Sequence, residues 1–311
     1  MKARYLLMVI GLVLAFATSQ KIQAQLIPVT SCEQTLSAAG EYVLMNDIDC
    51  SAATGDITGV RITASNVIFH LAGHTISSTV CDQTRNVTGI FVVGGITNVK
   101  VDGGNVSGFN DGVLLSSSNS SVKGVKVTGA CFSGIGVQGI NNRIEKNTAT
   151  GNGDGVLLLS TISAIVRSNN LSGNLRDGVA LSGDNTTDNL IEDNIINNNG
   201  SVGGYGVAII NGSNNTVRDN AVNHNSNGIF IDSPNNRVRE NTVNGSSDVG
   251  IAVSLLGSPS TVRLNTVLGS GNADMTDESL GCGGNTWRNN TFITDLVNGI
   301  SNGGPNAGCL R

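Results

Sequence analysis

Two aspartates, Asp154 and Asp177, are the clearest candidates for acid–base chemistry, because each stands directly before the glycine of the same short motif, Gly-apolar-any-apolar. If the two motifs form neighbouring strands, the carboxylates lie about 4.8 Å apart. Like charges so close raise one pKa, which leaves a proton donor beside an ionised partner. The spacing is nearer to the carboxylate pair of retaining glycosidases than to the wider inverting pair. If the protein is an enzyme, this pair is its predicted catalytic site.

A structural role is the alternative for this pair, and the residue types favour it. Asp-Gly is a common turn dipeptide, in which a carboxylate bonds its own turn amides. Ser133 and Asn227 fill the same position in other copies of the motif and make the same turn bonds. Arg176, next to Asp177, is also able to neutralise the pair without catalysis.

A row of charged residues forms a second candidate site. One residue after a recurring apolar position stand Glu145, Arg167, Glu192, Arg218, Arg239, Arg263 and Arg288. Arginine matches carboxylates and sulfates with two parallel hydrogen bonds, so the last four predict a binding site for an acidic substrate. Alternatively, solvent and the adjacent Asp193, Asp219 and Glu240 screen the row. Tyr205 is the predicted aromatic contact to a sugar ring, unless it only packs over its own repeat.

The elements that position these residues follow from internal repetition. The glycine motif recurs every 21 to 30 residues, mostly near 22, with its glycine at Gly59, Gly89, Gly112, Gly134, Gly155, Gly178, Gly206, Gly228 and Gly250. A second mark, an asparagine three residues after an apolar residue, shares this period at Asn147, Asn169, Asn194, Asn220, Asn241, Asn265 and Asn290. Two independent marks with one period predict a repeat architecture.

The content of each repeat predicts an all-β solenoid. Each period holds short runs of alternating apolar residues separated by Gly, Asn, Asp and Ser, a pattern typical of strands and turns. One repeat cannot bury its own apolar face, so the repeats must stack. Coils of about 22 residues with two or three strands make a single parallel β-helix, in which stacked asparagines bond to one another and to the backbone. Leucine-rich repeats, propeller blades and calcium-binding nonapeptide rolls do not match this period and composition.

Three segments resemble the right-handed parallel β-helix repeat proteins of the pectin-lyase-like superfold. They are residues 40–50 (GEYVLMNDIDC), residues 66–76 (NVIFHLAGHTI), and residues 282–292 (CGGNTWRNNTF) with Cys309. The exported bacterial members, including the periplasmic copper-binding NosD-like proteins, are similar over nearly all of the chain. The resemblance implies a right-handed coil but no single activity, because this architecture hosts many functions.

The signatures of known activities on this fold are missing. The chain has no Asp-Asp pair, no Asp-Pro element and only Gly73-His74-Thr75 in place of Gly-His-Gly. The histidines His70, His74 and His224 are scattered, and no Met, His and Cys cluster supports copper, so no metal or cofactor is expected. Whether the chain is an enzyme stays open. The prediction is an exported protein that binds extracellular or cell-surface carbohydrate; the alternative is a lyase, glycoside hydrolase or epimerase acting on an acidic polysaccharide.

The ends of the chain predict export and capping. Residues 1–24 have a basic start, an apolar run too short for a comfortable membrane span and a cleavage site, and so predict a signal peptide. The expected layout is an N-terminal cap at 25–58, the β-helix at 59–293 and a C-terminal cap at 294–311. Cleavage removes three of the 18 basic residues against 23 acidic ones, so the mature charge is 15 − 23 = −8. This negative charge argues against nucleic acid and anionic membranes as partners. The mature protein is predicted to be a monomer that is secreted or periplasmic.

Six cysteines in an exported chain predict disulfides. Cys32 and Cys50 lie in the first cap, and Cys282 and Cys309 bracket the last coil, so these are the expected pairs. Cys81 and Cys131 are about two coils apart. Since each coil rises about 4.8 Å, their pairing depends on whether the Cys81 loop folds over, and it stays open.

Overall fold

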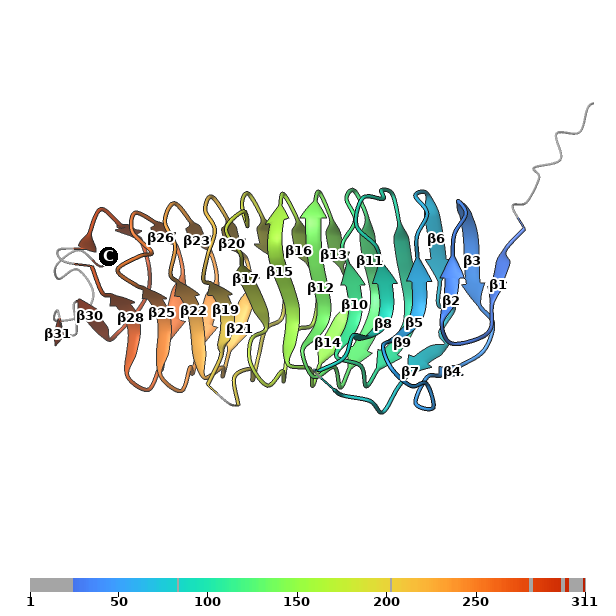
Figure 1. The fold of residues 1–311 in the computed structure, drawn as a ribbon. Coiled ribbons are helices and arrows are strands. Elements are labelled where there is room, and N and C mark those ends of the chain that lie inside the picture. The colour runs from blue at the N-terminus through green and yellow to red at the C-terminus, as the bar shows by residue number, and fades with distance from the viewer. Residues whose placement is uncertain are drawn as a thin grey trace, which may run out of the picture.

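Short stretches of alternating apolar residues form the strands, and Gly, Asn, Asp and Ser turn the chain between them. The computed structural model describes residues 25–82, 84–201, 203–279, 282–297, 300–301 and 310, within which every element is a β-strand of two to nine residues. The coils stack along one axis, with the first strands at one end and the last strands at the other (Figure 1). The predicted parallel β-helix is confirmed.

One long face of the solenoid is sheet A. Its strands pair in parallel in the order β1 (Ile27–Val29), β3 (Gly40–Leu44), β6 (Val67–His70), β9 (Lys100–Ser107), β11 (Ser121–Thr128), β13 (Arg143–Glu145), β16 (Ile165–Arg167), β18 (Leu190–Glu192), β20 (Thr216–Arg218), β23 (Arg237–Arg239), β26 (Thr261–Arg263) and β29 (Thr286–Arg288). Off this path lie β4 (Ile48–Asp49), β7 (Thr75–Ser77) and β14 (Thr148–Thr150).

The second long face is sheet B. Its order is β2 (Gln34–Leu36), β5 (Ile57–Ile62), β8 (Val87–Val92), β10 (Asp111–Leu115), β12 (Ser133–Ile140), β15 (Asp154–Ile162), β17 (Val179–Ser182), β19 (Tyr205–Ile209), β22 (Asn227–Ile231), β25 (Val249–Val253), β28 (Ala273–Asp277), β30 (Asp295–Val297) and β31 (Ile300–Ser301), the last antiparallel. A short third sheet holds β21 (Ala221–Asn223), β24 (Thr242–Asn244) and β27 (Thr266–Leu268).

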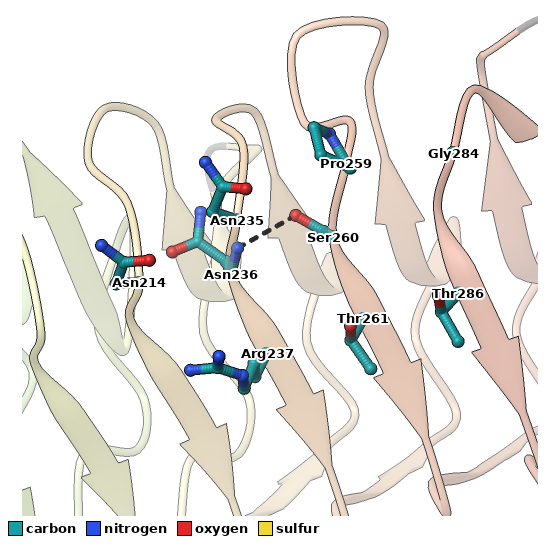
Figure 2. A pocket seen from close by; sticks show the side chains of 9 residues that line it. All are labelled: Asn214, Asn235, Asn236, Arg237, Pro259, Ser260, Thr261, Gly284 and Thr286. Atoms are coloured by element: carbon teal, nitrogen blue, oxygen red, sulfur yellow. Dashed lines mark hydrogen bonds between the residues drawn. The ribbon is translucent and has the colours of Figure 1, made fainter.

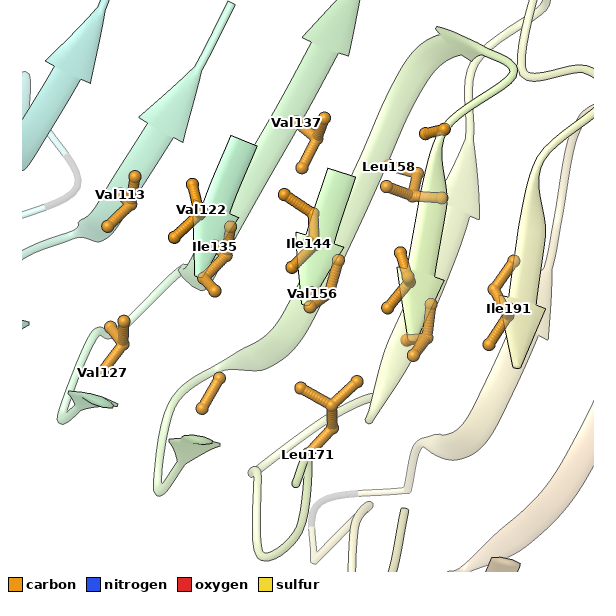
Figure 3. Packing of buried hydrophobic residues seen from close by; sticks show 14 of the residues in the cluster. Val113, Val122, Val127, Ile135, Val137, Ile144, Val156, Leu158, Leu171 and Ile191 are labelled. Atoms are coloured by element: carbon orange, nitrogen blue, oxygen red, sulfur yellow. The ribbon is translucent and has the colours of Figure 1, made fainter. Parts of the chain in front are cut away.

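Each strand sends alternate side chains into the solenoid, where like residues stack in rows. Val113, Ile135 and Val156 are register partners on sheet B, and Val122 and Ile144 are register partners on sheet A. All five are fully buried, and the two sets face each other across the interior (Figure 3). Because coils meet edge to edge in one register, the strands fix which side chains point outward.

The recurring glycines mark places where successive coils approach closely. A Cβ built on Gly155 lies 2.5 Å from the carbonyl oxygen of Gly178, and one on Gly178 lies 2.7 Å from that of Gly206. No real Cβ tolerates such a contact. The glycine of the sequence motif is therefore a steric requirement of coil stacking.

The asparagines of the second sequence mark form the predicted ladder. The Oδ1 of Asn169 accepts hydrogen bonds from both the backbone N–H and the Nδ2 of Asn147, at 2.8 and 3.1 Å. The Nδ2 of Asn169 donates to the carbonyl of Ile144, one coil earlier. The same arrangement repeats in each following coil as far as Asn290. These amides form hydrogen bonds with buried backbone N–H and C=O groups at a bend, where no hydrogen bonds between strands are available.

Two further ladders run parallel to the first. One stacks Asn152, Asn174, Asn199 and Asn225. The other contains Asn142 and, after an interruption at Ala164, continues through Asn189, Asn215, Asn236, Ser260 and Asn285. Their members are fully or nearly fully buried, apart from the half-buried Asn285. Three internal polar rows thus hold the coils in register.

Disulfides fix the first coils. Cys32 and Cys50 form a bond with a Cα–Cα distance of 5.6 Å, the pairing expected from the sequence. Cys81 and Cys131 also pair, with a Cα–Cα distance of 6.1 Å. Their loop does fold over: Asn110 of the intervening coil accepts from the Asp82 N–H and donates back to the Asp82 carbonyl. These hydrogen bonds hold the loop against the intervening coil, so that Cys81 reaches Cys131.

The remaining predictions for the ends are only partly covered by the described residues. Cys282 is disulfide-bonded, but Cys309, the partner expected for it, lies outside them, as do residues 1–24. The part of the chain that is described holds no helix long and apolar enough to cross a membrane. Strands β1 and β3, within residues 25–58, already pair in parallel as part of sheet A. The cap boundaries remain a prediction.

Candidate functional site

The predicted acidic residues lie in one outward row where the strands of sheet B begin. Asp111, Ser133 and Asp154 are register partners at the starts of β10, β12 and β15. Asp177 and Tyr205 continue the row in the next two coils, since the strands that they precede or open pair in the same register. Stacking therefore brings Asp154 and Asp177 side by side, the arrangement on which the catalytic prediction depends.

Asp154 is buried and held by a cation. The residue is only 5% exposed, and its Oδ2 accepts a hydrogen bond from Nη2 of Arg176 at 2.9 Å. Its Oδ1 accepts the backbone N–H of Asp177 at 3.2 Å. Burial raises the pKa of Asp154, and the Arg176 charge acts against this rise. Asp154 bonds the amide of the next coil, not its own turn amides as the structural alternative assumed.

Asp177 is the more strongly perturbed acid. Burial, with help from the charge of Asp154, raises its pKa from the usual 3.8 to about 6, although its Oδ1 accepts the Tyr205 N–H at 2.7 Å. Burial raises the pKa of Asp111 as well, against a hydrogen bond from the Ser133 hydroxyl at 2.5 Å. The row therefore holds three acids whose pKa is raised by burial, Asp111, Asp154 and Asp177, and one cation, Arg176, which pairs with Asp154.

The raised pKa predicts a pH-dependent stability that Asp177→Asn removes. Because the pKa of Asp177 is higher in the folded than in the unfolded state, the free energy of unfolding of the protein falls as the pH rises from about 4 through about 6. Asparagine cannot ionise, and its Oδ1 still accepts the Tyr205 N–H. Above pH 6 the variant is expected to gain about 1–2 kcal/mol in the free energy of unfolding, discounted for partial exposure, and below pH 4 it gains nothing.

Urea unfolding at a series of pH values checks this result. Asp56→Asn is the matched control, because hydrogen bonds from Asn86 lower the pKa of the exposed Asp56. Its loss of stability should appear at neutral pH and shrink as the pH falls, the opposite sign. A difference between wild type and Asp177→Asn that stays constant with pH contradicts the assignment.

Two hollows lie along this row and form what we call the sheet-B groove. One, of about 300 Å³, is lined by Arg85, Thr88, Asp111, Leu114 and Phe132 among others. The other, of about 270 Å³, is lined by Phe132, Asp154, Leu157, Arg176 and Asp177 among others. Phe132 lines both hollows, so they adjoin at its ring.

Phe132 is the functional candidate that sequence reasoning missed. Phe132 is 40% exposed, and the Arg176 guanidinium lies 5.0 Å from the centroid of its ring. Arg176 also donates a hydrogen bond to the Phe132 carbonyl at 3.0 Å. The preceding residue, Cys131, is tied to Cys81, which anchors this corner of the groove. An aromatic ring, a cation and buried acids thus converge on one surface, the usual composition of a ligand site.

Tyr205 does not line either hollow. Its ring stacks on that of Phe230 in β22, with centroids 4.9 Å apart and planes 15° apart. This contact matches the alternative that it packs over neighbouring coils, and it places the tyrosine farther along the same face.

The predicted arginine row lies on sheet A, not on sheet B. Glu145, Arg167, Glu192, Arg218, Arg239, Arg263 and Arg288 are successive register partners, so the row exists as expected. Arg167 pairs with Glu145 at 3.0 Å, and Arg218 pairs with both Glu192 and Asp219. Since the acids and the arginines occupy different faces, they cannot act on the same sugar ring.

A polar cleft of about 230 Å³ lies at the turns that lead into β23, β26 and β29. It is lined by Asn214, Asn235, Asn236, Arg237, Pro259, Ser260, Thr261, Gly284 and Thr286 (Figure 2). The backbone N–H of Asn236 donates a hydrogen bond to Oγ of Ser260. Asn214, Asn235 and Arg237 are exposed. The cleft offers amide, hydroxyl and guanidinium groups to a polar ligand.

Sequence comparison with protein families gives two matches. Residues 88–234 match the family described as right handed beta helix region, and residues 177–306 match the family described as periplasmic copper-binding protein (NosD). No curated protein has a significant sequence match to this chain.

Solved structures share the fold at low identity. The Dettilon tailspike protein (gp208) has a TM-score of 0.65 and 16% identity, over 81% of this chain and 56% of its own. The A-module of the Azotobacter vinelandii mannuronan C-5 epimerase AlgE6 has a TM-score of 0.59 and 19% identity, over 83% of this chain and 74% of its own. A double mutant of the periplasmic alginate epimerase AlgG has a TM-score of 0.56 and 14% identity, over 84% and 78%. At such identities the likeness concerns the fold alone.

The described residues do not fit a copper ion. Every described cysteine is in a disulfide, which removes the thiolates that bind copper. His70 and His74 each face a different aspartate, Asp102 at 2.8 Å and Asp47 at 3.3 Å. Over the described ranges no three His, Cys, Asp or Glu side chains gather into a metal-binding group. The function proposed below therefore involves no copper.

The family matches overlap and together run from residue 88 to residue 306. The parallel register of sheets A and B extends the same coil back to β1. With the fold likeness to the tailspike and the two epimerases, these findings agree on one architecture. The chain is a right-handed parallel β-helix repeat protein.

Proposed function

We propose that this protein binds a polysaccharide along the sheet-B groove. The observation that carries the proposal is the exposed ring of Phe132 between two hollows, with Asp111 on one side and Asp154 and Asp177 on the other. Sugar rings present apolar C–H faces that pack on aromatic rings and hydroxyl groups that donate to carboxylates. Leu114 and Leu157 add an apolar floor beneath the same path.

The setting supports this proposal. The similar structures named above include a mannuronan epimerase and an alginate epimerase, and both mannuronan and alginate are polysaccharides. Disulfides belong to oxidising compartments, and the matched NosD family is described as periplasmic. We therefore infer an exported, monomeric protein, secreted or periplasmic, whose residues 1–24 are removed as a signal peptide.

Catalysis on the bound glycan is the second candidate, and one observation favours it. Asp177, with a pKa of about 6, stands directly beside Asp154, whose charge Arg176 stabilises. Burial favours the protonated form of Asp177, while Arg176 favours the ionised form of Asp154 against the effect of burial. Such a difference between two neighbouring carboxyl groups is what a lyase, hydrolase or epimerase uses. Binding alone needs no such pair, so a turnover assay separates the two functions.

Phe132→Ala tests the binding site. Loss of the ring removes the apolar contact from the centre of the groove, and we expect about tenfold weaker binding of whichever neutral glycan the wild type retains. Isothermal titration of the mature protein against a panel of neutral and acidic polysaccharides measures this. The control is Leu256→Ala, an exposed apolar residue outside the groove. Unchanged affinity in Phe132→Ala rejects the groove.

The same panel, scored for product release, tests catalysis. Asp154→Asn combined with Asp177→Asn should abolish any turnover while the glycan still binds. If this double variant folds and keeps full turnover, the acidic row is structural.

A further inference from the structure

The arginine row on sheet A loses its counter-charges toward the C-terminal end. Arg218 forms ion pairs with Glu192 and Asp219, and Arg239 pairs with Glu240. Both of these arginines are half-buried. The alternative that neighbouring acids neutralise the row is therefore right for these two coils.

Neighbouring acids do not neutralise the arginines of the next two coils. Arg263 and Arg288 are exposed, and no carboxylate of the described residues lies within ion-pair distance of either. The position that carries Asp219 and Glu240 in the preceding coils carries Leu264 and Asn289 here. The arginines continue while their partners stop.

Stacking places these cations directly beside one another. Arg239, Arg263 and Arg288 are consecutive register partners, so their backbones are about 4.8 Å apart. Like charges directly opposite each other on a sheet destabilise it. An anion lying along the row would remove this cost.

The polar cleft of Figure 2 adjoins the same row. Arg237, Thr261 and Thr286 line the cleft, and each stands two residues before an arginine of the row on the same strand, β23, β26 or β29. Residues two apart on a strand point to the same side. Arg237 is exposed, and no ion pair links it to a carboxylate in the part of the chain described. We call Arg237, Arg239, Arg263 and Arg288, with these two threonines, the sheet-A arginine surface.

We propose that the sheet-A arginine surface binds a linear anionic polysaccharide whose chain runs parallel to the solenoid axis. One pyranose unit is comparable in length to the rise of one coil, so a glycan with one carboxylate or sulfate per unit meets one guanidinium per coil. Arginine binds such groups with two parallel hydrogen bonds, while threonine hydroxyls and the cleft amides suit the sugar hydroxyls. This second site is on the other face from the sheet-B groove and does not depend on it.

The charge of the whole chain favours a glycan over a nucleic acid. With 23 acidic and 18 basic residues, the protein carries a net negative charge, and the row Arg239, Arg263 and Arg288 is only one residue wide on each strand. Nucleic-acid sites need a broad basic field around the contact. A thin polyanion that follows a single row of arginines avoids the surrounding acids.

The test is a triple variant, Arg237→Gln, Arg263→Gln and Arg288→Gln, titrated with polygalacturonate at low ionic strength. Each arginine supplies a charged hydrogen bond, so the affinity should fall at least about tenfold. The matched control, Lys100→Gln, Lys123→Gln and Lys126→Gln, removes the same charge from exposed positions on the N-terminal half of sheet A and should change affinity by less than about twofold. Equal losses in the two triples overturn the proposal, as does absence of binding to the wild type.

Further probes identify the ligand chemistry. Methyl-esterified polygalacturonate should bind at least about tenfold more weakly than the acid form, and added salt should weaken binding of the acid form. Tighter binding of dextran sulfate assigns sulfate as the preferred group, and tighter binding of polygalacturonate assigns carboxylate. Single-stranded DNA that binds more tightly than either glycan overturns the proposal. Phe132→Ala should leave this binding intact, which keeps the two sites distinguishable.

Discussion

Replacing Asn220 with alanine is expected to lower the free energy of unfolding by about 3 kcal/mol. The Oδ1 of Asn220 accepts both the backbone N–H and the Nδ2 of Asn194, each at 3.0 Å. Its Nδ2 donates to the Ile191 and Arg218 carbonyls and to Asn241. Alanine leaves these groups buried without partners, at a cost of about 1–3 kcal/mol for each group that water cannot reach.

Urea unfolding followed by circular dichroism measures this loss. Asn272→Ala is the matched control, since Asn272 is exposed and its side chain makes no hydrogen bond within the described structure. The control should leave the unfolding midpoint nearly unchanged. Similar midpoints for the two variants would mean that the ladder contributes nothing to stability.

Gly228→Ala should be as damaging, for a different reason. The added Cβ would lie 2.1 Å from the carbonyl oxygen of Gly250 and 2.5 Å from Cγ1 of Val243. Neither atom can move without shifting a coil, because one is backbone and the other belongs to a buried core residue. Overpacking of this kind typically costs up to about 3 kcal/mol, and we expect a loss at that upper end.

Gly94→Ala controls for the general effect of losing a glycine. Its nearest contact would be the Ser116 carbonyl oxygen at 3.6 Å, an ordinary distance. Alanine there should be neutral, or stabilising by about 0.4–1 kcal/mol through the unfolded state. Thermal unfolding of both variants decides the matter: if Gly228→Ala melts with Gly94→Ala, the coils are not in the tight contact described.

Much of the fold could be predicted because one period governs it. The glycine motif and the asparagine mark each recur near 22 residues, and both have a physical cause in coil stacking. Two of the three asparagine ladders were missed. Their signal was present, since Asn152 lies five residues after Asn147 and Asn142 five residues before it, and later coils repeat both offsets.

The candidate site was only partly predictable. Register alone brings Asp154 and Asp177 together, so the sequence placed the pair. The partner Arg176 and the ring of Phe132 come from corners between strands, whose path no periodic pattern determines. The Cys81–Cys131 bond was undecided for the same reason, because it depends on a loop that crosses one coil.

Every rung of the asparagine ladders points the same way. An Oδ1 accepts from the coil before it, as Asn169 does from Asn147, and this direction repeats through Asn194 and Asn220. Each coil therefore offers its successor the same donors that it received from its predecessor. Inserting or deleting one whole repeat joins matching groups, whereas half a repeat leaves donors facing no acceptor. Gene duplication can thus lengthen this protein in whole-coil steps, and each step adds about 4.8 Å along the solenoid axis.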